Sequence, residues 1–246
     1  TDAAVEEPRA ATPAVAAQEA SKRHELQLVD PADAIAAELM TRATRIAPTD
    51  PVGAARTLVE LGVYAERARD DARRARRFYE ESRSMVRLFE PALDRLRRLV
   101  PVASEPETML GLVGDAIVAA ENDRARGDLF GERARILTAL GRPAEARAAY
   151  EEALGLVPEH PAALRGLEAV LRGGTERATV EALARHLETL AERYAPAEGK
   201  PDGDARLTAW LLVERADLLE LRLKQPDLAL ATLERAIGFE STPGPV

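Results

Sequence analysis

Apolar residues recur along most of the chain at the spacing of one helix face. Between residues 143 and 156, for example, Ala146, Tyr150 and Ala153 follow one another at intervals of four and three, which places them on the same side of a helix. Segments of this kind, each about 12 to 20 residues long, begin near Pro31 and are separated by short stretches rich in Pro, Gly and Asp. The pattern predicts an all-α fold of helices joined by tight turns.

The predicted helices also repeat along the chain. An offset of 71 along the sequence superimposes Tyr-Glu-Glu at 79–81 on the same three residues at 150–152, and it brings 92–93, Ala-Leu, onto 163–164. A weaker copy lies near 208–240. Because this offset is close to twice the period of about 34 that is typical of one family of helical hairpins, the repeating unit is predicted to be two hairpins.

Residues 127–158 resemble a tetratricopeptide repeat in length and in most signature positions. The matching positions are Ala134, Leu137, Ala146, Tyr150, Ala153 and Pro158. Phe130 stands where the family has Trp, and Arg133 stands where it has Leu. This segment is therefore similar to the family without matching it at every position.

Further copies of the repeat are less complete. The copy at 55–87 keeps Ala75 and Tyr79 but has Ser82 in place of the usual Ala, and two poor copies lie at about 89–125 and 161–203. The resemblance implies an all-α, right-handed superhelical solenoid of about five helix-turn-helix hairpins. A HEAT-like stack of helical hairpins is the alternative.

The sequence is predicted to have three regions. Residues 1–28, rich in Ala, Pro and Glu, are expected to be a flexible leader. Residues 29–240 are expected to form the TPR-like domain with its two-hairpin unit, and residues 241–246 a C-terminal tail or truncation point.

Charge and composition narrow the range of functions. The net charge of −8 argues against nucleic acid as a partner, because phosphate binding requires a basic surface. Cysteine is absent, which removes disulfides and thiolate sites. The sequence contains no run of 18 apolar residues and therefore predicts no transmembrane segment. We expect a cytoplasmic location, with export after processing as the alternative.

No motif in the sequence points to catalysis. Neither a Rossmann turn nor a P-loop is present, and the histidines His24, His160 and His186 lack the i, i+4 pairing that zinc hydrolases use. Adjacent acids such as Glu151 and Glu152 point about 100° apart on a helix and form a solvated face. We therefore expect no enzyme, no catalytic residue, no cofactor, no metal and no small-molecule substrate.

Nine arginines gather between residues 70 and 98. They could hold an acidic peptide or RNA through their guanidinium groups. Acidic residues are interspersed among them, however, which favours ion pairs four residues apart on an exposed helix. The exposed helix is the favoured interpretation, and an acidic protein segment is the next.

The family resemblance implies where a partner would bind. In tetratricopeptide proteins the first helix of each hairpin lines a concave groove that receives a peptide or helix of another protein. Carried over to this sequence, the predicted groove positions are Arg56, Val63, Glu66, Arg67, Arg135, Thr138, Arg165, Arg172, Trp210 and Asp217. The function predicted is that of a protein-binding scaffold or adaptor, and the alternative is a structural spacer or an oligomerisation module that fills its own groove.

Overall fold

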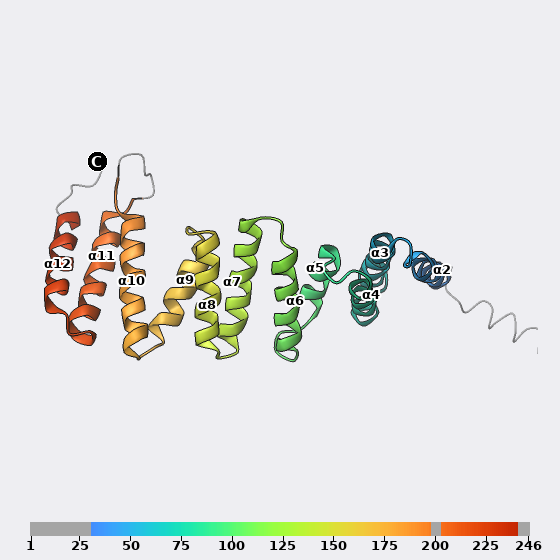
Figure 1. Cartoon of the computed structure of the whole chain (residues 1–246), viewed down its shortest axis with the longest axis horizontal. Coiled ribbons are helices and arrows are strands. Elements are labelled where there is room, and N and C mark those ends of the chain that lie inside the picture. The colour runs from blue at the N-terminus through green and yellow to red at the C-terminus, as the bar shows by residue number, and fades with distance from the viewer. Residues whose placement is uncertain (1–30, 198–202, 241–246) are drawn as a thin grey trace, which may run out of the picture. The chain divides into compact units, whose positions relative to one another are not determined.

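A computed structural model describes residues 31–197 and 203–240 of the chain (Figure 1). These residues form α-helices and one short π-helix, and none of them lies in a strand. The predicted all-α fold is confirmed. The predicted leader, residues 1–28, and the tail, residues 241–246, lie outside the described residues.

The chain divides into two compact units, Thr1–Leu99 and Val100–Val246. The helices of unit 1 are α2 (Pro31–Ile46), α3 (Pro51–Arg69), α4 (Ala72–Met85) and α5 (Glu90–Leu99). The elements of unit 2 are α6 (Pro106–Ala119), α7 (Asp123–Ala139), α8 (Pro143–Leu156), α9 (Pro161–Arg172), α10 (Arg177–Tyr194), α11 (Ala205–Asp217), the π-helix η1 (Leu218–Arg222) and α12 (Pro226–Glu240).

Short polar residues start several of these helices. The side chains of Asp50, Asp71, Asn122 and Asp204 each accept a hydrogen bond from the backbone N–H three residues ahead, at 2.8 to 3.0 Å. Such caps satisfy amide groups that have no partner inside the helix. The Asp and Pro punctuation of the sequence thus marks helix starts, as its pattern indicates.

Three helix pairs pack closely as hairpins: α3 with α4, α7 with α8, and α11 with α12. Each pair turns through one residue with a left-handed backbone, namely Asp70 (φ 51°), Gly141 (φ 69°) or Lys224 (φ 59°). Asp70 and Gly141 are separated by the offset of the sequence repeat. These three hairpins coincide with the three better copies of the repeat.

Small side chains let the helices of a hairpin approach each other. Ala54, Ala75, Ala134, Ala146 and Ala153 are all fully buried. Ser82 on α4 stands where the family usually has Ala. Its buried hydroxyl donates a hydrogen bond of 2.9 Å to the carbonyl of Ala55 on α3. A buried hydroxyl is tolerated where it finds such an acceptor.

The poor copy at 161–203 is arranged differently. Its helices α9 and α10 contact each other, but α10 packs more extensively on α11, and α9 packs more extensively on α8. The link between α9 and α10 also lacks a residue with positive φ. The helices of this copy are therefore divided between the hairpins on either side of them.

Candidate functional site

The first helices of the hairpins expose most of the predicted groove positions. In α3, Arg56 and Arg67 are exposed, whereas Val63 and Glu66 are half-buried. In unit 2 the exposed positions are Arg135 and Thr138 on α7, Arg165 and Arg172 on α9, and Trp210 and Asp217 on α11. Within each helix of unit 2 they recur at intervals of three or seven residues, so each set lies on one face.

Glu66 is already engaged inside unit 1. It accepts a hydrogen bond from the hydroxyl of Tyr79 on α4 and lies 3.7 Å from the guanidinium of Arg95 on α5. Burial of the Tyr79 phenol, together with its hydrogen bond to Glu66, raises the pKa of that phenol well above its ordinary value. Glu66 thus joins three helices, and its carboxylate serves the fold.

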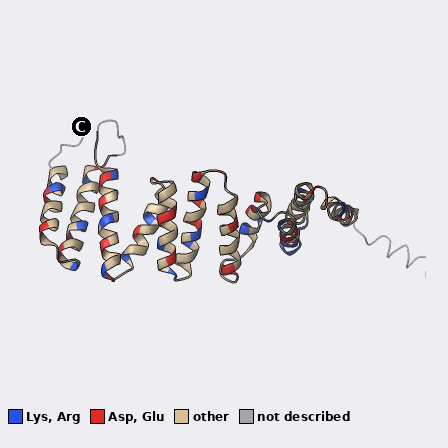
Figure 2. Cartoon of the chain, viewed as in Figure 1, with Lys and Arg blue, Asp and Glu red and all other residues tan. Residues whose placement is uncertain are grey.

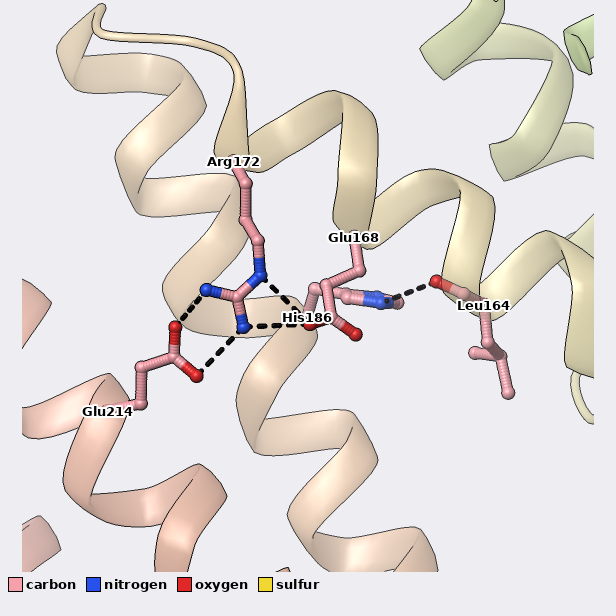
Figure 3. A network of polar contacts seen from close by, with 5 residues as sticks. All are labelled: Leu164, Glu168, Arg172, His186 and Glu214. Carbon is pink, nitrogen blue, oxygen red and sulfur yellow. Dashed lines mark hydrogen bonds and ion pairs between the residues drawn. The ribbon is translucent and has the colours of Figure 1, made fainter.

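Arg172 is engaged inside unit 2 (Figure 3). Its guanidinium donates to Glu168 one turn earlier on α9, at 2.7 and 2.9 Å, and to both carboxylate oxygens of Glu214 on α11, one of them at 2.8 Å. The hydrogen bonds with Glu214 raise the pKa of Arg172 above its ordinary value. Arg172 therefore ties the exposed face of α9 to that of α11.

The two helices that this bridge connects carry several of the predicted positions of unit 2. Arg165 lies two turns before Arg172 on the same face of α9, and Trp210 lies one turn before Glu214 on α11. Trp210 is 55% exposed and Val213 beside it is 40% exposed. An aromatic ring and an aliphatic side chain are thus open to solvent on α11, the helix that Arg172 of α9 contacts through Glu214. We call Arg135, Arg165, Trp210 and Val213 the first-helix surface.

Two histidines hold α9 in place. At its start, Nδ1 of His160 accepts a hydrogen bond from the N–H of Ala163, so Nε2 is the donor to Asp128 of α7, at 2.8 Å. Further along, Nε2 of His186 on α10 donates to the carbonyl oxygen of Leu164 at 3.0 Å (Figure 3). Burial lowers the pKa of His186. These contacts fix the helix that carries Arg165.

Unit 2 also contains a cleft of about 860 Å³ that the sequence did not predict. Its walls are the outer face of α8, including Arg147 and Glu151, and the link from α9 to α10, including Gly173 and Gly174. Thr138 is the one predicted groove position among the residues lining this cleft. The cleft therefore lies largely apart from the first-helix surface.

The arginine-rich segment is laced with ion pairs. Arg76 lies 2.7 Å from Glu80, Arg98 lies 2.7 Å from Asp94, and Arg74 lies 2.8 Å from Asp33 on α2. Figure 2 shows the two signs of charge interspersed along the helices. This arrangement supports the exposed-helix interpretation over a uniform basic patch.

Neither a metal site nor a membrane-spanning helix is found among residues 31–197 and 203–240. No group of three or more potential ligands there could hold a metal ion. No helix in the same ranges is long and apolar enough to cross a membrane.

A sequence model of the tetratricopeptide repeat family matches residues 128–170, which run from α7 into α9. This part of the chain is a tetratricopeptide-like repeat. The match covers the hairpin α7–α8, which carries the most complete signature. This hairpin turns at Gly141, which has a left-handed backbone, and its residues Ala146 and Tyr150 are buried. No curated protein matches this TPR-like chain.

Several solved structures are similar to the TPR-like chain. YrrB, described as a TPR protein with an unusual peptide-binding site, is 16% identical, with 81% of this chain and 91% of YrrB covered and a TM-score of 0.46. A tetratricopeptide repeat protein from Parabacteroides merdae is 19% identical, with coverages of 90% and 78% and a TM-score of 0.44. BtubC from P. vanneervenii is 18% identical, with coverages of 87% and 93% and a TM-score of 0.36.

Proposed function

We propose that this chain is a non-enzymatic scaffold that binds a peptide or helix of another protein on the first-helix surface of unit 2. The observation that carries the proposal is the joined, exposed face of α9 and α11. There the ion pair between Arg172 and Glu214 connects the helix that carries Arg165 with the helix that carries Trp210 and Val213. Exposed aromatic anchors and arginines are the side chains most enriched at binding hot spots.

The chemistry of this surface suggests the chemistry of the partner segment. Trp210 and Val213 offer apolar contact, while Arg135 and Arg165 are exposed guanidinium groups that can pair with carboxylates. Arg172 is less suited to this role, because two glutamates already occupy its donors. A segment with an apolar anchor and acidic residues fits best.

The test is retention of a protein partner by the immobilised full chain. We expect the double variant Arg135→Glu/Arg165→Glu to weaken retention of that partner by about tenfold, or about 1.4 kcal/mol, with no change in thermal unfolding. Arg185→Glu is the matched control, because Arg185 is an exposed arginine on the second helix α10. Full retention by the double variant would place the partner elsewhere.

Self-association is the competing function, since a spacer or oligomerisation module would bury the same surface against a second copy. Light scattering separates the two. The scaffold proposal expects a monomer in the absence of a partner. A dimer that Trp210→Ala disrupts would favour the oligomerisation module.

A further inference from the structure

Helix α12 exposes a stripe on which apolar and acidic side chains alternate. Asp227, Leu230, Glu234 and Ile237 follow at intervals of three, four and three residues, which places them on one face. Leu230 is 60% exposed and Ile237 is 61% exposed, and both acids are exposed as well. We call these four residues the α12 stripe.

In the other hairpins the two central positions of this face carry an ion pair. The alignment that brings Ala146 of α8 onto Ala229 of α12 also brings Arg147 onto Leu230. In α4 the corresponding residue is Arg76. Both arginines pair with a glutamate four residues later, Arg147 with Glu151 at 2.8 Å and Arg76 with Glu80 at 2.7 Å.

In α12 the glutamate of this pair is present but its arginine is replaced. Glu234 is equivalent to Glu151, and the residue four positions before it is Leu230. The substitution adds apolar surface and at the same time removes the guanidinium that balances the carboxylate in α4 and α8. Both changes favour a partner that supplies apolar contact and a positive charge.

The hairpin α7–α8 shows what covers this side of a hairpin elsewhere in unit 2. Tyr150, the equivalent of Leu233, lies against Gly166 of α9, and Leu154, the equivalent of Ile237, is half-buried. Arg147 and Glu151 form one wall of the cleft that the link from α9 to α10 closes on the other side. In α8 this side of the hairpin is therefore covered in part, by the next helix α9.

We propose that the α12 stripe binds an amphipathic helix of a partner protein that presents leucine-like side chains together with arginine or lysine. The apolar side chains meet Leu230 and Ile237, and the basic ones meet Asp227 and Glu234. This surface is separate from the first-helix surface and prefers the opposite charge in its partner. The proposal does not depend on binding at Arg135 or Arg165.

A second copy of this chain fits the stripe less well. In a two-fold symmetric contact the same patch faces itself, so both copies would bring Asp227 and Glu234 into the interface and the stripe would supply no basic side chain to pair with them. Like charges placed together in an interface are unfavourable. Charge complementarity thus selects a basic helix over self-pairing.

The probe for the test is a fluorescein-labelled peptide with the sequence of residues 159–175 of this chain, carrying the changes Glu159→Gln and Glu168→Gln. It contains the leucines of α9, and Arg165 and Arg172 give it a net positive charge. Fluorescence anisotropy with the full chain should show saturable binding that weakens as salt is added. Leu230→Arg and Ile237→Arg should each weaken it about tenfold or more. A peptide with both arginines changed to glutamate should bind comparably weakly.

Ile35→Arg is the matched control, because Ile35 on α2 of unit 1 is also 61% exposed. This variant and the Arg135→Glu/Arg165→Glu chain should bind the peptide as the unchanged protein does. Leu230→Arg recreates the Arg–Glu pair of α4 and α8, so it retains the fold even if Ile237→Arg does not.

Three results would overturn the proposal. The first is an absence of saturable peptide binding, and the second is equal binding by the unchanged chain and the Leu230→Arg chain. The third is a dimer in light scattering that Leu230→Arg converts to monomer, because the occupant would then be a second copy.

Discussion

Tyr79 and Tyr150 hold equivalent positions of the repeat, but they pack in different directions. In unit 1 the ring of Tyr79 lies against Gly62 of α3, the partner helix of its own hairpin. In unit 2 the ring of Tyr150 lies against Gly166 of α9, the helix that follows its hairpin. A carbon placed on either glycine would lie 2.2 Å from the tyrosine ring.

The difference shows that one side chain can serve two kinds of contact. Tyr79 closes a hairpin and, through Glu66, connects it to α5. Tyr150 instead connects α8 to the helix that follows its hairpin, α9. Because large buried aromatic rings contribute strongly to core stability, Tyr79 stabilises mainly its own hairpin, whereas Tyr150 stabilises the contact between α8 and α9.

The largest expected effect comes from filling the space beside each ring. Gly62→Ala and Gly166→Ala should each lower the free energy of unfolding by about 2 kcal/mol, because overpacking a rigid core displaces the ring or the backbone. Urea unfolding measures both. Trp210, the sole tryptophan, lies in unit 2. Gly166→Ala should therefore shift the unfolding transition seen by tryptophan fluorescence. Gly62→Ala should shift only the transition seen by circular dichroism.

Gly111→Ala provides the control for these variants. Gly111 is exposed within α6, and no atom lies within 4 Å of the added carbon. Alanine is the better helix former there, so this change should stabilise unit 2 by about 0.5–1 kcal/mol. Equal destabilisation at Gly111 and Gly166 would remove the special role assigned to the contact with Tyr150.

Removing the hydroxyl group of Tyr79 or of Tyr150 should cost less stability, and the two costs should differ. Tyr79→Phe removes the hydrogen bond to Glu66 and should cost about 1 kcal/mol, a value reduced because Glu66 is half-buried and keeps Arg95. Tyr150→Phe keeps the ring contact with Gly166 and should cost less than about 0.5 kcal/mol. Thermal and urea unfolding of both variants test the ranking, and equal costs would contradict it.

The smallest expected effect is a loss of stability of unit 2 at acidic pH. Because burial lowers the pKa of folded His186, the unfolded chain takes up a proton first as the pH falls through the ordinary histidine value of about 6.5. Stability that is complete above that pH is then progressively lost below it. Unit 2 should therefore weaken on acidification, and less so in His186→Gln, whose amide can still donate to Leu164.

Trp210 fluorescence in urea, at about pH 7.5 and about pH 5, measures this loss across the histidine range. His186→Gln should show the smaller change between the two conditions. If both proteins lost stability equally, a group other than His186 would be the cause of the acid sensitivity of unit 2.

The helices and hairpins could be predicted because their cause is local. Apolar spacing, Asp caps and prolines act within a few residues, and the structure has helix starts at the positions that they mark. The direction in which Tyr79 and Tyr150 pack was not predictable, because the same Tyr-Glu-Glu sequence surrounds both. The difference depends on Gly62 in one case and Gly166 in the other, which lie on opposite sides of the tyrosine along the chain.

The candidate site was predictable in part for the same reason. Exposure of Arg135, Arg165 and Asp217 follows from helix periodicity. The ion pair of Arg172 with Glu214 does not follow from helix periodicity, because Glu214 is 42 residues away along the chain. The cleft beside α8 was missed because its walls are mostly small residues and backbone, whose shape depends on how α9 and α10 diverge.

The π-helix η1 records an insertion of a single residue. Between the two hairpins, Glu132 of α7 is equivalent to Glu214 of α11, and Gly141 is equivalent to Lys224 in the turn that follows η1. The stretch from Glu214 to Lys224 is longer by one residue than the stretch from Glu132 to Gly141. The wider winding of a π-helix accommodates one additional residue without interrupting the helix. Both flanks thus keep their contacts, and the last hairpin changes its length without changing how its two helices meet.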